Sequence, residues 1–160
     1  MDILNRMPPF WRVFTVATVA FVVVSALPLF FISTLIVWVI VALAGWKYPQ
    51  LLADKVRQMS SPTGYAVGMG ALMGAAVNVA GVVLMLVWTL VWASIATDAV
   101  ASSHQAHGDQ AAAAAGAAAF AGVSIVSWLI SAFFAPFVGA ALGAFGGLIG
   151  GSQIPKSITE

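Results

Sequence analysis

The chain alternates between long apolar blocks and short polar stretches. The apolar blocks cover residues 13–46, 64–96 and 111–151, and the polar stretches around them hold nearly all the charged side chains. A helix needs about 20 residues to cross the hydrocarbon core of a bilayer, and each block exceeds this length. The pattern predicts an all-α fold whose helices span a membrane.

The first block is too long for one span and contains a break. With the two aromatic residues before it, it runs for about 36 residues, or roughly 54 Å as one helix, against a core of about 30 Å. Pro28 lacks an N–H and disfavours helix at the residue before it. We expect two short spans, about 10–26 and 29–46, joined by a tight turn. A cleaved signal peptide is the alternative for the first, because basic residues precede it and small residues end it.

Aromatic residues set the expected ends of the later spans, because Trp and Tyr favour the headgroup level. A tyrosine and a tryptophan bracket a third span of about 65–88, and a further tryptophan opens a fourth of about 128–150. The residues between these two spans are expected to form helical extensions outside the bilayer around a polar loop at about 97–110.

Pro136 interrupts the last apolar block. A proline inside a helix removes one hydrogen bond and bends the axis. We expect one helix kinked at Pro136, and the alternative is two half-spans broken there.

The stretch from Pro49 to Met59 predicts a short helix lying in the membrane interface. Proline suits the first helical position. Apolar positions can face lipid while the charged neighbours face water; these apolar residues are Leu51, Leu52, Val56 and Met59.

Composition agrees with a membrane environment. Apolar residues make up 62% of the chain and charged residues 7%, with a mean hydropathy of +1.04. Soluble domains run nearer 45–50% apolar and about 25% charged, so an ordinary soluble domain is excluded. A nucleic-acid partner is excluded too, because it would require a basic surface. There are no cysteines, which excludes disulfides and thiolate metal sites.

The few charges predict the orientation. With four spans, all six basic residues fall on one side: Arg6, Arg12, Lys47, Lys55, Arg57 and Lys156. The other side carries Asp98, His104, His107 and Asp109. Because an excess of Lys and Arg marks the cytoplasmic side, both termini are expected in the cytoplasm, in a multi-pass protein of the cell (plasma or inner) membrane.

Glycines recur every four residues in the third and fourth predicted spans. Small residues at this spacing line one stripe of a helix and let another backbone approach closely, as in a glycine zipper. The two rows are Ala66, Gly70 and Gly74, and Gly139, Gly143, Gly147 and Gly151. The topology places both rows at the same depth in antiparallel helices, so we expect them to pack together. The alternative is that the last helix uses its row between subunits of a homo-oligomer.

Asn78 is the only amide side chain deep in a predicted span, one turn after Gly74. In lipid it must find a hydrogen-bond partner. We expect an interhelical bond to backbone or to a serine such as Ser131, and the alternative is a substrate or ion site.

No pattern predicts catalysis. There is no nucleophile–base pair and no pair of carboxylates, and no Asp, Glu, Lys, Arg or His lies deep inside a predicted span, which argues against a pump. His104, His107 and Asp109 could ligate Zn²⁺, but their Gly- and Ser-rich surroundings favour a solvated loop. We therefore expect no enzymatic activity, no cofactor and no metal.

Several segments resemble a class of small, glycine-rich four-helix membrane proteins of bacteria and archaea that are grouped as domains of unknown function. The segments are Leu27-Pro28-Leu29, Ala44-Gly45-Trp46, Gly64–Ala76 and Pro136-Phe137-Val138-Gly139 through Gly150-Gly151. The resemblance implies a membrane four-helix bundle. It implies no activity and no functional residues.

The sequence favours a non-enzymatic accessory or scaffold component that packs in the bilayer, within a larger membrane complex or a homo-oligomer. The alternative is a small oligomeric channel or transporter for neutral or apolar solutes, using Asn78 and the glycine faces. An intramembrane enzyme is the least favoured hypothesis.

The orientation is tested by a reporter fused after Glu160. We expect an enzyme that functions only in the cytoplasm to be active there, because the basic residues face that side. Activity of a reporter that functions only outside the cytoplasm would overturn the orientation.

Overall fold

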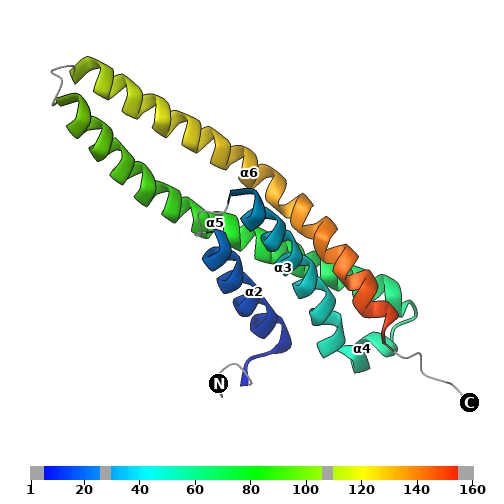
Figure 1. The fold of residues 1–160 in the computed structure, drawn as a ribbon. Helices are drawn as coiled ribbons and strands as arrows, with labels where there is room; N and C mark the ends of the chain where they lie inside the picture. Colours follow the sequence, from blue (N-terminus) through cyan, green and yellow to red (C-terminus); the bar gives the residue numbers. More distant parts are fainter. Residues whose placement is uncertain (1–5, 26–29, 106–109, 155–160) are drawn as a thin grey trace, which may run out of the picture. The chain divides into compact units, whose positions relative to one another are not determined.

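The computed structural model describes residues 6–25, 30–105 and 110–154, and the secondary structure in these ranges is helical. The helices in chain order are α2 (Pro9–Ser25), α3 (Phe30–Leu51), α4 (Ala53–Arg57), α5 (Pro62–Gln105) and α6 (Gln110–Ser152) (Figure 1). The prediction of an all-α fold is confirmed for the described residues.

Three helices contain stretches that are long and apolar enough to cross a membrane. These stretches are Ser33–Leu51, Pro62–Val91 and Ala114–Ser152. α2 is apolar too, but with 17 residues it is shorter. The composition and these three helices together indicate a membrane protein.

α5 and α6 are much longer than one bilayer crossing. They have 44 and 43 residues, or about 66 and 64 Å at 1.5 Å per residue, against a core of about 30 Å. α6 continues through Pro136 as one helix, without a break there.

The segment after the second expected span differs from the prediction. Pro49 lies inside the last turn of α3, where its side chain is fully buried, and α4 is only five residues long. Val56, expected to face lipid, is fully buried in a cluster with Ala66 and Ile154. The prediction of a helix that starts at Pro49 is therefore wrong. Pro49 and Val56 are buried against the protein, so this segment packs on other helices.

The chain forms two compact units. The first contains the residues up to Gly81 together with those from Phe134 onward; in it, α2 and α3 lie side by side and antiparallel (Figure 1). The second, Val82–Phe133, contains the remaining parts of α5 and α6. There the Trp128 indole N–H donates to the carbonyl oxygen of Val82 at 3.0 Å, which links the two helices.

Candidate functional site

The glycines of α6 face two neighbouring helices within the first unit. One row meets α5, and a second row, which shares one glycine with the first, meets α3. The row toward α5 is Gly139, Gly143, Gly147 and Gly151; the row toward α3 is Gly143, Gly146 and Gly150. Gly143 belongs to both rows, so α6 is held on two sides.

The contact between α5 and α6 leaves no room for a side chain. A Cβ atom built on Gly70 would lie 2.8 Å from Cα of Gly147, and one on Gly74 would lie 2.7 Å from Cα of Gly143. Real Cβ atoms essentially never come within 3.0 Å of another heavy atom, and backbone atoms cannot move aside cheaply. The two predicted glycine rows therefore lie against each other, backbone to backbone.

α3 contributes a contact that the sequence analysis missed. A Cβ on Gly45 would lie 2.6 Å from Cα of Gly143, and one on Gly146 would lie 2.8 Å from the backbone nitrogen of Trp46. Gly45 is the only glycine of α3. A helical glycine is about 1 kcal/mol less favourable than alanine, so its presence among bulky residues was the available signal. We call Gly45, Gly70, Gly74 and Gly143 the glycine junction.

Asn78 uses its amide inside this unit. Its Nδ2 donates to the carbonyl oxygen of Ala135 at 2.7 Å, and the residue is 9% exposed. Ser131, the other partner considered, donates to Ser127 in its own helix at 2.9 Å. Asn78 thus forms the interhelical bond to backbone, one turn beyond the glycine junction.

A second polar contact ties the end of α3 to the end of α6. The side-chain oxygen of Gln153 accepts from Trp46 Nε1 at 3.0 Å and from Gln50 Nε2 at 2.8 Å. Neither Gln50 nor Gln153 belongs to a repeating pattern in the sequence, so no sequence signal indicated that they pair.

The polar loop adds no site to the described part of the chain. His107 and Asp109 lie outside the described residues, and the side chain of His104 is not described. Within the described ranges, no three His, Cys, Asp or Glu residues come together as metal ligands. Of the residues singled out from the sequence, the structure brings together Gly70, Gly74, Asn78, Gly139, Gly143 and Gly147, with Gly151 against Ala66. This arrangement holds the helices together through backbone contact and one hydrogen bond from the amide of Asn78.

Replacing Gly143 by alanine tests the glycine junction. The new methyl group would meet backbone atoms of α5, so we expect unfolding in detergent to become easier by about 1–3 kcal/mol, the usual range for overpacking. Gly68→Ala is the matched control, because nothing lies within 4 Å of a Cβ there. Its stability should rise by up to about 1 kcal/mol, because alanine forms helix more readily than glycine and the new methyl group meets no neighbour. Equal effects of the two substitutions, measured by denaturant titration, would contradict the contact geometry.

Replacing Asn78 by alanine tests the hydrogen bond from its amide to Ala135. We expect a loss of about 1 kcal/mol in the same titration, typical of a hydrogen bond between membrane helices. Ser131→Ala is the control, because the hydrogen bond of this serine to Ser127 lies within its own helix, and it should leave stability nearly unchanged. An Asn78→Ala variant as stable as the unmodified chain would show that the bond contributes nothing.

Comparison with known proteins adds no assignment to this geometry. No family model, curated protein or solved structure matches the chain. The resemblance to small glycine-rich four-helix proteins stays a prediction, and the function has to be argued from the helices themselves.

Proposed function

We propose that the chain is a non-enzymatic accessory or scaffold component of a membrane assembly. In this proposal it crosses the cell membrane four times, with α2 as the first span and both termini in the cytoplasm. The glycine junction and the bond of Asn78 support a packing role, because they fix helices and leave the Asn78 amide engaged.

The observation that carries the proposal is apolar surface beyond the reach of one bilayer. The apolar stretch of α6 has 39 residues, or about 58 Å, nearly twice a core of about 30 Å. Before the expected start of the last span at Trp128, Val123 and Val126 are 71% and 56% exposed. Exposed apolar patches outside lipid mark interaction surfaces. A partner protein that packs on this part of α6 would cover them.

The matching part of α5 supports the same conclusion. Beyond the expected end of the third span at Trp88, Val91 and Ile95 are exposed on the helix that pairs with this part of α6 in the second unit. Pairing of the two helices therefore leaves apolar side chains uncovered on both of them.

Site-specific photo-crosslinking in native membranes tests the proposal. A photoreactive residue at position 126 should form a covalent adduct with a second, different membrane protein. The control position is Phe145, which lies on the same helix and is 61% exposed but falls inside the expected span; it should label lipid only.

Two outcomes would overturn the accessory role. Adducts with lipid alone at position 126 would show that the bilayer covers this surface. Adducts only with a second copy of the chain would favour the oligomeric channel or transporter, a function that also requires Asn78 to leave Ala135 and face a pore.

A further inference from the structure

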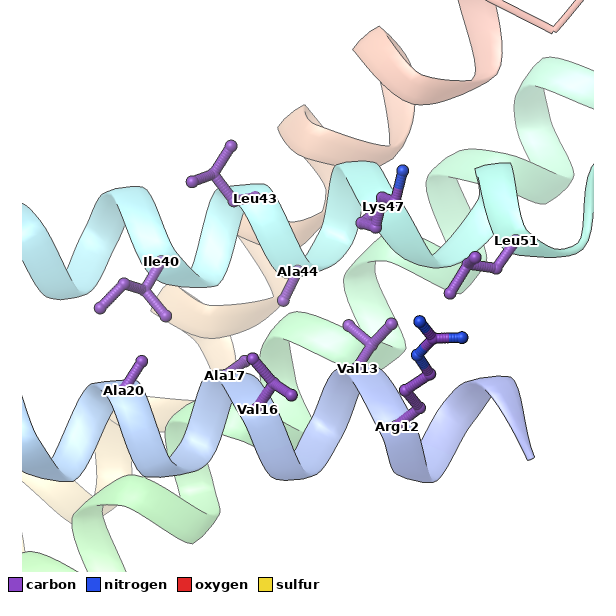
Figure 2. Close-up of a pocket in the computed structure, with 10 residues that line it drawn as sticks. All are labelled: Arg12, Val13, Val16, Ala17, Ala20, Ile40, Leu43, Ala44, Lys47 and Leu51. Carbon is purple, nitrogen blue, oxygen red and sulfur yellow. The ribbon is translucent and has the colours of Figure 1, made fainter. Parts of the chain in front are cut away.

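α2 and α3 leave a groove between them with a volume of about 450 Å³ (Figure 2). Ligand pockets in proteins commonly have about 300–1,000 Å³. Small side chains of both helices, Ala17, Ala20 and Ala44, line it and give it width. We call it the α2–α3 groove; its remaining lining residues are Arg12, Val13, Val16, Ile40, Leu43, Lys47 and Leu51.

The groove is charged at one end and apolar along the rest. Arg12 lies near the start of α2 and Lys47 near the end of α3, and the antiparallel arrangement brings both to the same end (Figure 2). Ala20 and Ile40 lie at the other end. The eight-residue separation from Arg12 to Ala20 corresponds to about 12 Å along the helix.

The two cations are available to a ligand. Both side chains are exposed. In the described ranges the salt bridge of the protein joins Arg57 and Asp54, and no carboxylate lies within 4.0 Å of Arg12 or Lys47. Nζ of Lys47 lies 5.7 Å from the centroid of the Trp46 ring. Among the described residues, those that line the α2–α3 groove include no acidic side chain.

We propose that the α2–α3 groove binds an anionic phospholipid. The phosphate lies between Arg12 and Lys47, and an acyl chain runs along Val16, Ala20, Ile40 and Leu43. A ligand with one anionic head and an apolar tail matches both ends of the groove, whereas a soluble anion would use only the charged end and an apolar helix only the rest. Basic pockets between membrane helices bind anionic headgroups on the side where basic residues gather. This inference stands independently of the accessory role.

Native mass spectrometry of the purified full chain in mild detergent tests the proposal. The probes are phosphatidylglycerol, phosphatidylcholine with the same acyl chains, and inorganic phosphate. We expect phosphatidylglycerol to bind tightest. Removal of each charge, by Arg12→Gln or Lys47→Gln, should weaken it about fivefold, the size expected for one cation near an anionic headgroup.

Two further variants separate the groove from general surface charge. Lys55→Gln removes an exposed cation outside the groove and should leave phosphatidylglycerol binding unchanged. Ala20→Phe keeps both charges but fills the apolar part, and should also weaken phosphatidylglycerol binding. Circular dichroism confirms that each variant keeps its helix content.

The proposal fails under three results. Equal affinity for the two lipids would show that the cations do not select the headgroup. A Lys55→Gln effect as large as that of Lys47→Gln would reduce the preference to unspecific surface charge. Inorganic phosphate that displaces phosphatidylglycerol at equal concentration would identify a soluble anion as the ligand.

Discussion

The packing of the first unit depends on the contact of three helix backbones at Gly143. Lipid tails are as apolar as leucine side chains, so the hydrophobic effect does not drive helices together inside a bilayer. Association depends on close packing, and close packing requires residues without bulk. Gly45, Gly70 and Gly74 supply them around Gly143. Glycine also loses no side-chain freedom on packing, so the contact is formed without that entropic loss.

Polar side chains extend this contact toward both ends of the helices. Asn78 bonds to the backbone of Ala135 on one side of the glycine junction, and Gln153 joins Trp46 and Gln50 on the other. A hydrogen bond from a side-chain amide is directional, whereas backbone packing alone would allow one helix to slide past the other by one turn. The two polar contacts therefore favour one register of α6 against α5 and α3.

The packing of α5 against α6 could be predicted from the sequence because its glycines recur at a regular spacing. Glycines four residues apart define a stripe, and the order of the helices fixes which stripes meet. Gly45 escaped prediction because a single glycine defines no stripe. Val56 was misplaced for a different reason: a valine suits lipid and protein equally, so its type does not reveal that Ala66 and Ile154 cover it. Arg12 and Lys47 were expected on one side of the membrane, but their place in one groove depends on how α2 and α3 align.

The unequal lengths of joined helices have a consequence for the surrounding lipid. The apolar stretch of α3 has 19 residues and that of α6 has 39, or about 28 and 58 Å. Because Gly143 joins the two helices near the ends of these stretches, a bilayer that matches α3 leaves part of the apolar stretch of α6 outside the hydrocarbon core, where a partner has to cover it. Without that partner, tilting or local thickening of the bilayer is needed to absorb the mismatch, at a fraction of a kcal/mol for each ångström. Lipids beside α3 and beside α6 would then be deformed to different extents, and membranes of different thickness would accommodate the unpartnered protein unequally.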